Sequence, residues 1–196
     1  MRTKYIRDKN VQIALKRVLE QLKPQSVLGY WPLGFEADLR KILLENRCVR
    51  KVYLPFMEGV SFKMVPLRLP LERKAFGIFE PRDTIYKINK IDVAIVPAVG
   101  VDGSLGRVGF GKGMYDRFFP TLKIRPYTIF IQSQECKTKR FLCDDYDVRA
   151  DLLITPRQVY RVRKYHVKRA TRRGGRCHPE RSSRFFNFKK DFSRPF

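Results

Sequence analysis

Short apolar runs, separated by helical and polar segments, restrict the fold of this chain more than any other feature. Five such runs are present: Ser26–Trp31, Lys51–Pro55, Asp92–Pro97, Tyr127–Ile131 and Asp151–Thr155. The run Asp92–Pro97 (DVAIVP) is typical of a strand buried on both faces. Strands that alternate with helices favour parallel pairing through helical crossovers. The sequence therefore predicts an α/β fold with a mostly parallel central sheet flanked by helices on both faces.

Two amphipathic segments supply helices for this fold. The first ends before Pro24 and places four apolar residues on one helical face: Val11, Leu15, Val18 and Leu22. The second is predicted over Glu36–Asn46, with Leu39, Ile42 and Leu43 directed inward.

The remaining segments are assigned by alternation and by turn residues. Val60–Val65 alternates, with Val60, Phe62 and Met64 on one side, which suits a strand with one wet face. Pro66–Thr84 is predicted to be an extended loop. A short helix is expected after the glycine-rich segment described below, and strand signals fade after residue 155.

The charge of the chain is strongly basic and uneven. The 196 residues carry a formal net charge of +23, which favours anionic partners such as nucleotides, polycarboxylates or nucleic acid. Residues 157–196 hold fourteen Lys and Arg against two acidic residues. We therefore expect one domain over residues 1–160, followed by a basic, disordered extension over residues 161–196.

The cysteines indicate reduced thiols rather than a disulfide framework or a metal site. They are Cys48, Cys136, Cys143 and Cys177, with no CxxC pair. The N-terminus is charged and lacks an apolar run, and no stretch approaches the ~20 apolar residues of a membrane helix. The expectation is a cytoplasmic monomer that does not associate with membranes.

The segment Arg107–Asp116 (RVGFGKGMYD) is the most informative in the chain. Glycines two apart let backbone N–H groups line an anion without interference from a Cβ atom. Arg107 and Lys112 add cations, and Asp116 adds a carboxylate of the kind that a magnesium–nucleotide site needs. The segment lacks the GK[ST] of a Walker loop. Without further context, a flexible glycine loop with solvated charges explains it equally well.

The run GVDGSLGRVGFGKGMYDRFF resembles the signature of the 5-formyltetrahydrofolate cyclo-ligase family, R-[LV]-G-x-G-x-G-x-Y-D after a strand that ends in proline. Other family features follow in the expected order between Val27 and Pro156. They are Trp31-Pro32, Glu36-Ala37-Asp38, Leu54-Pro55, Phe76-Gly77-Ile78-Phe79-Glu80-Pro81, Asp92–Pro97, Gln134 and Tyr146-Asp147-Val148-x-x-Asp151.

The resemblance implies roles for individual residues. The ATP phosphates would be bound by the glycine loop, with Arg107 and Lys112 acting in catalysis: Arg107, Val108, Gly109, Phe110, Gly111, Lys112, Gly113, Met114 and Tyr115. The folate would be contacted by Trp31, Glu36, Phe76 and Tyr115. Mg²⁺ would be held by Asp116 and Asp147. The implied reaction is the ATP-dependent cyclisation of 5-formyltetrahydrofolate to 5,10-methenyltetrahydrofolate, with release of ADP and phosphate.

Alternatives remain open at this point. Glu36 also suits the first turn of a helix, and Trp31 and Phe76 also suit the core. Met114 stands where many family members have tyrosine. The family's N-terminal K-x-x-x-R helix has no clear match, although Lys4 and Arg7 are candidates. A non-catalytic folate binder and a basic nucleic-acid-binding protein are the competing hypotheses.

Overall fold

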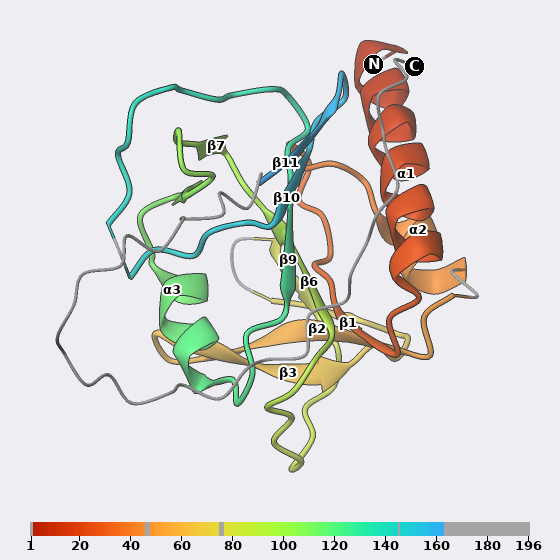
Figure 1. Cartoon of the computed structure of the whole chain (residues 1–196). Coiled ribbons are helices and arrows are strands. Elements are labelled where there is room, and N and C mark those ends of the chain that lie inside the picture. Colours follow the sequence, from red (N-terminus) through yellow and green to blue (C-terminus); the bar gives the residue numbers. More distant parts are fainter. Residues whose placement is uncertain (1, 46–47, 75–76, 145, 163–196) are drawn as a thin grey trace, which may run out of the picture. The chain divides into compact units, whose positions relative to one another are not determined.

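A seven-stranded sheet forms the centre of the protein (Figure 1). In the computed structural model its strand order is β11-β10-β9-β6-β1-β2-β3. The five inner strands run parallel, and β3 and β11 pair antiparallel at the two edges. The strands are β1 Ser26–Leu28, β2 Lys51–Glu58, β3 Ser61–Pro66, β6 Val93–Pro97, β9 Tyr127–Ile131, β10 Leu152–Ile154 and β11 Val159–Arg161. The predicted α/β fold with a mostly parallel sheet is confirmed.

The structure describes residues 2–45, 48–74, 77–144 and 146–162. The extension predicted over residues 161–196 therefore lies almost wholly outside the described residues. Within them, the helices are α1 Arg2–Leu22, α2 Arg40–Glu45 and α3 Met114–Phe118, with a 3₁₀ turn at Phe119–Thr121. Two small ladders join β4 Glu72–Arg73 to β5 Phe79–Glu80, and β7 Gly100–Val101 to β8 Arg107–Val108. None of these helices is both long and apolar enough to span a bilayer.

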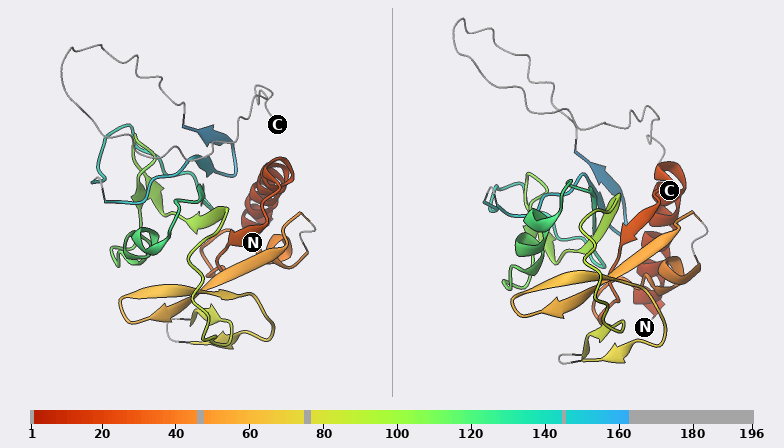
Figure 2. Two further views of the ribbon diagram at one scale, coloured as in Figure 1. Left: turned by 60° about the horizontal axis from the view of Figure 1, so that its bottom comes forward. Right: turned by 90° about the horizontal axis from the view of Figure 1, so that it is seen from below.

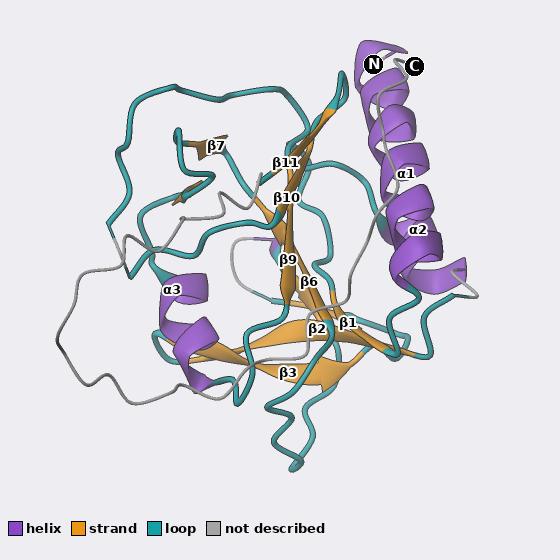
Figure 3. Ribbon diagram, in the orientation of Figure 1, coloured by secondary structure: helices purple, strands orange, loops and turns teal. Residues whose placement is uncertain are grey.

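Helices cover both faces of the sheet (Figure 3). On one face α1 and α2 pack against alternate strand residues such as Val27, Ile95 and Ile129. On the other face α3 packs against their neighbours, including Ala94 and Phe130. This alternation follows from the period of two along a strand. It explains why the parallel strands are apolar on both sides.

The hairpin of β2 and β3 extends well beyond the parallel strands (Figure 2). Gly59 turns it with a φ of 57°, and Phe62 and Met64 are buried on one side as the alternation predicts. Val60, expected on that same side, is 71% exposed because it lies in the turn.

The order of the parallel strands identifies where a ligand can bind. Along the sheet these strands run β2-β1-β6-β9-β10, so the chain reverses direction across the sheet between β1 and β6. In open α/β sheets, the crevice at the carboxyl ends of the strands at such a switch point is the usual binding site. The loops that follow β1 and β6 are therefore the first place to look for function.

The second predicted helix is much shorter than expected. It begins at Arg40 rather than Glu36, because side chains engage the carbonyl oxygens that a longer helix would need. Lys4 donates to the carbonyl of residue 36, Tyr30 to that of residue 37 and Gln12 to that of residue 38. Glu36 is thus a loop residue, and its interpretation as a first-turn helix carboxylate was wrong.

Other differences are local. The first strand ends at Leu28, so Trp31 lies in the following loop. The strand β11 was missed because a tight turn creates it: Thr155 N–H and its hydroxyl both donate to the carbonyl of Gln158. The loop predicted over Pro66–Thr84 contains the small β4–β5 ladder.

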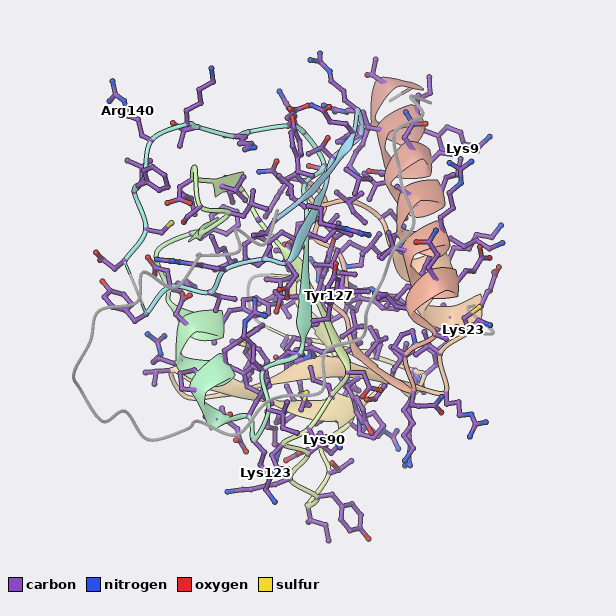
Figure 4. All side chains as sticks on the ribbon, viewed as in Figure 1. Lys9, Lys23, Lys90, Lys123, Tyr127 and Arg140 are labelled. Carbon is purple, nitrogen blue, oxygen red and sulfur yellow. The ribbon has the colours of Figure 1, made fainter. Side chains whose placement is uncertain are left out.

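Basic side chains are spread around the described part of the chain. Figure 4 shows Lys9 and Arg140 on opposite sides of the view and Lys90 and Lys123 near its bottom, and all four are exposed.

Candidate active site

A cavity of about 680 Å³ opens at the switch point of the sheet. Pro97 and Ile131, the last residues of β6 and β9, form part of its wall. The rest comes from the loops after β1, β6 and β9, from the β2–β3 hairpin, from Ile78 and Phe79 at the start of β5, and from the glycine-rich loop. The cavity is large enough for a drug-sized ligand.

The glycine-rich loop forms one wall of the cavity. Gly111 and Gly113 have φ values of 77° and 55°, a backbone conformation that other residues rarely adopt. Lys112 between them lies in the cavity wall, and its carbonyl accepts a hydrogen bond from Arg117. Arg117 also donates through Nε to the carbonyl of Val60, at 2.8 Å, so it ties the loop to the β2–β3 turn. Sequence reasoning missed this role of Arg117, and no motif signals it.

Arg107 lies at the base of the same wall. Its Nε donates to the carbonyl of Pro97 at 3.1 Å, and its guanidinium carbon lies 4.9 Å from the centre of the Tyr115 ring. Burial raises the pKa of Tyr115, against the opposing effect of Arg107, and Glu36 raises it further. Tyr115 therefore stays a neutral phenol that can donate a hydrogen bond into the cavity. The cation–π contact fixes Arg107 beside it.

Glu36 lies in another part of the cavity wall, on the loop after β1. Its Oε2 accepts a hydrogen bond from the backbone N–H of Leu33 at 2.8 Å. Burial raises the pKa of Glu36, while the Leu33 N–H and the charge of Arg107 lower it in part. Trp31 lies in the same wall and also packs against the core, so its place in the core does not keep it out of the cavity. Its contact with folate stays a prediction.

Asp116 binds the backbone at Val148, the residue after Asp147, and neither aspartate lies in the cavity wall. Asp116 Oδ1 accepts from the N–H of Val148 at 3.0 Å, and Asp147 Oδ2 accepts from the N–H of Asp144 at 2.8 Å. Each carboxylate keeps a second oxygen outside these two bonds. No cluster of three or more His, Cys, Asp or Glu suited to a metal occurs in the described ranges. Mg²⁺ needs only one or two carboxylates when phosphate oxygens complete its shell, so this pair fits that ion.

The structure therefore brings together most of the residues expected from the sequence. The cavity wall contains Trp31, Glu36, Arg107, Phe110, Lys112, Gly113, Met114 and Tyr115. Val108, Gly109 and Gly111 belong to the same loop but not to the wall. Phe76 lies outside the described residues. The short helix expected after the loop is present, with five residues.

The first turns of α1 border the cavity without lining it. Lys4 Nζ donates to the carbonyl of Glu36 at 2.9 Å and pairs with Asp8 at 2.7 Å. Arg7 Nη1 donates to Gln134 Oε1 at 3.4 Å, and Gln134 belongs to the wall. Lys4 and Arg7 thus each bind one segment of the cavity wall.

Asp102 is a further residue that sequence reasoning missed. It is fully buried. Its carboxylate accepts hydrogen bonds from Ser104 and Gly106, just before the glycine-rich loop, and from the backbone of residues 142 and 143, just before Asp147. Burial opposes its charge, but the hydrogen bonds from Ser104 and from the N–H groups of Cys143, Gly106 and Leu142 keep its pKa well below the ordinary value. The Asp-Gly-Ser sequence is typical of an Asx turn and is the one local signal of this role.

Comparison with known proteins places the chain among relatives. Over 78 residues it is 37% identical to a protein of Mycoplasma pneumoniae named 5-formyltetrahydrofolate cyclo-ligase, across 39% of this chain and 47% of that protein. Over 112 residues it is 26% identical to a protein of the same name from Haemophilus influenzae, across 51% of this chain and 58% of that protein. The matched segments span about half the length of these curated relatives.

Solved structures agree in fold. The NMR structure of 5,10-methenyltetrahydrofolate synthetase from Aquifex aeolicus gives a TM-score of 0.62 at 28% identity, across 88% of this chain and 84% of that one. The synthetase of Mycoplasma pneumoniae gives 0.59 at 22% identity, across 78% and 87%, and shows the same fold.

The family model of the 5-formyltetrahydrofolate cyclo-ligases matches residues 6–156, which include every element of the parallel sheet and the whole glycine-rich loop. This chain therefore belongs to the 5-formyltetrahydrofolate cyclo-ligase family.

Proposed function

We propose that the protein catalyses the ATP- and Mg²⁺-dependent cyclisation of 5-formyltetrahydrofolate to 5,10-methenyltetrahydrofolate. One observation carries the proposal: a single cavity has a cationic glycine-rich loop in one wall and the half-buried carboxylate of Glu36 in another. The first wall suits a polyphosphate and the second suits a heterocycle rich in N–H donors. Family membership and the curated relatives' names support the same reaction.

The folate would bind against the Glu36 wall. In the proposed pose the carboxylate of Glu36 accepts hydrogen bonds from the N–H groups of the pterin. Trp31 and Tyr115 lie in the same cavity and provide aromatic surface for the ring. Tyr115 also offers a neutral hydroxyl, since its raised pKa keeps the proton on the phenol.

The ATP phosphates would bind the glycine-rich loop. Lys112 supplies a charge at the wall, and Arg107 is held beside Tyr115 with its guanidinium fixed. Phosphoryl transfer depends mainly on positioning and on neutralising charge, so the site needs no catalytic His or Cys. Asp116 and Asp147 would hold Mg²⁺, which would neutralise phosphate charge when bound.

The proposed chemistry has two steps. The formyl oxygen on N5 attacks the γ-phosphorus, a P–O bond forms, and the bond to the β-bridging oxygen breaks with release of ADP. N10 then bonds to the formyl carbon and loses its proton to solvent. The carbon–oxygen bond breaks, and its electron pair leaves with inorganic phosphate. Arg107 and Lys112 stabilise the charge on the transferred group in both steps.

The test is the growth of the methenyl-folate absorbance band on mixing protein, 5-formyltetrahydrofolate and Mg-ATP. Lys112→Ala should lower kcat/KM by about 10²-fold or more, because a cation at the transferred phosphate is lost. Lys123→Ala removes the same charge at an exposed position outside the cavity wall, and should leave turnover unchanged (Figure 4).

Absence of the band from folded wild-type protein would refute the reaction. Folate binding without turnover would instead favour the non-catalytic folate binder.

A further inference from the structure

Two phenylalanines meet across the cavity from different walls. Phe35 lies on the loop after β1, and Phe110 lies in the glycine-rich loop. Their ring centres are 5.3 Å apart with an angle of 70° between the planes, which is an edge-to-face contact. The rings are 55% and 63% exposed, so this contact is not a by-product of core packing.

Each phenylalanine is adjacent in the chain to a residue of the proposed site. Phe35 directly precedes Glu36, and its carbonyl accepts a hydrogen bond from Ser133 Oγ at 2.7 Å. Phe110 has Gly109 and Gly111 on either side, so its ring is the only side chain in that stretch of the loop. The position of the ring therefore reports the position of the loop backbone. If the loop moves, the Phe110 ring moves with it and changes the packing of Phe35. The position of Glu36, the next residue in the chain, would then change as well.

We propose that Phe35 and Phe110 are positioning residues that couple the nucleotide and folate subsites of this cavity; this inference rests on the proposed function. A bound polyphosphate fixes the glycine-rich loop, and the fixed loop presents the Phe110 ring to Phe35. The contact holds the Glu36 loop in the arrangement that accepts the folate. Each ligand therefore binds more tightly when the other is present.

The strength of an edge-to-face ring contact limits how strongly nucleotide binding and folate binding can be coupled. Such a pair supports a coupling of roughly two- to twelvefold in affinity. Because coupling between two ligands is reciprocal, the nucleotide should strengthen folate binding by the same factor as folate strengthens nucleotide binding.

The test is calorimetric titration of the full chain with 5-formyltetrahydrofolate, with and without a non-hydrolysable ATP analogue and Mg²⁺. The ratio of the two Kd values measures the coupling in wild type and in Phe35→Leu, Phe110→Leu and the double variant. The ratio should be about two to twelve in wild type and close to one in each single variant, with no further loss in the double variant. Phe110→Tyr keeps the ring and should restore the ratio.

Phe141→Leu is the matched control, because Phe141 is 78% exposed and lies outside the cavity wall. It should keep the wild-type ratio. A wild-type ratio of one, or single variants that keep the full ratio, would overturn the coupling while leaving the proposed function intact. Failure of wild type to bind either ligand would instead overturn both.

Discussion

Asp102→Asn should destabilise the protein far more than an ordinary Asp→Asn substitution. Asp102 Oδ1 accepts from the N–H of Gly106 at 2.7 Å and from both the N–H and the hydroxyl of Ser104 at 2.8 Å. Oδ2 accepts from the N–H groups of Leu142 and Cys143 at 3.0 and 3.1 Å. Both carboxylate oxygens thus accept hydrogen bonds, whereas an asparagine side chain has only one acceptor oxygen. Whichever way its amide turns, at least two donors face an NH₂ group.

The cost follows from those lost acceptors. A buried donor without an acceptor costs about 1–3 kcal/mol, so two would cost about 2–6 kcal/mol. Leu142 is itself 62% exposed, so water can reach this edge of the network and lower the cost. We therefore expect a loss of about 2–4 kcal/mol, which is a large part of the 5–15 kcal/mol typical of a domain.

Asp92→Asn is the matched control. Asp92 is exposed, and its three accepted hydrogen bonds, from Gln25 N–H and from the N–H and hydroxyl of Ser26, all go to Oδ2. An asparagine can place its carbonyl oxygen there and direct its NH₂ to solvent. The expected loss is below about 1 kcal/mol.

The assay is equilibrium unfolding in urea, followed by far-UV circular dichroism at neutral pH. Equal losses in the Asp102 and Asp92 variants would refute the argument from acceptor geometry. So would a loss below about 1 kcal/mol for Asp102→Asn.

Three further predictions test other parts of the account. Because the pKa of Glu36 is raised, its carboxylate should be protonated at a higher pH than an ordinary glutamate, and affinity for 5-formyltetrahydrofolate should fall over that higher pH range on acidification. In titration calorimetry, Glu36→Gln should bind the folate weakly, with an affinity that does not change over that pH range. Arg117→Ala should raise the KM for ATP about three- to tenfold while leaving the urea midpoint nearly unchanged, since Arg117 is an exposed tether of the glycine loop; an unchanged KM would contradict this. Leu15→Ala should cost about 2–5 kcal/mol in urea unfolding, because Leu15 is fully buried between α1 and the sheet, and a loss below about 1 kcal/mol would show that this face is not packed as described.

The sheet was predictable because its strands are apolar on both faces. The predicted Tyr127–Ile131 matches β9 residue for residue, and Asp92–Pro97 exceeds β6 by one residue. A strand that is buried on both faces needs apolar residues throughout, and such a continuous apolar run is visible in the sequence. The early helix start at Glu36 was wrong because the bonds that prevent it come from Lys4, Gln12 and Tyr30, which no local pattern reveals.

The site was predictable only in part. The glycine spacing located the loop, and Gly111 and Gly113 do adopt the positive φ that such spacing favours. The tethers of the loop were not predictable, because Arg117 reaches Val60 and Asp102 reaches Cys143 across long separations in sequence. The metal role of Asp116 and Asp147 stays a prediction.

The most direct test of the central claim is the fate of the formyl oxygen. Protein, Mg-ATP and 5-formyltetrahydrofolate labelled with ¹⁸O in the formyl group would be allowed one turnover, and the released inorganic phosphate would be analysed by mass spectrometry. The account predicts one ¹⁸O atom in each phosphate, because the formyl oxygen leaves with the phosphoryl group it attacked. Unlabelled phosphate formed alongside the methenyl product would contradict it.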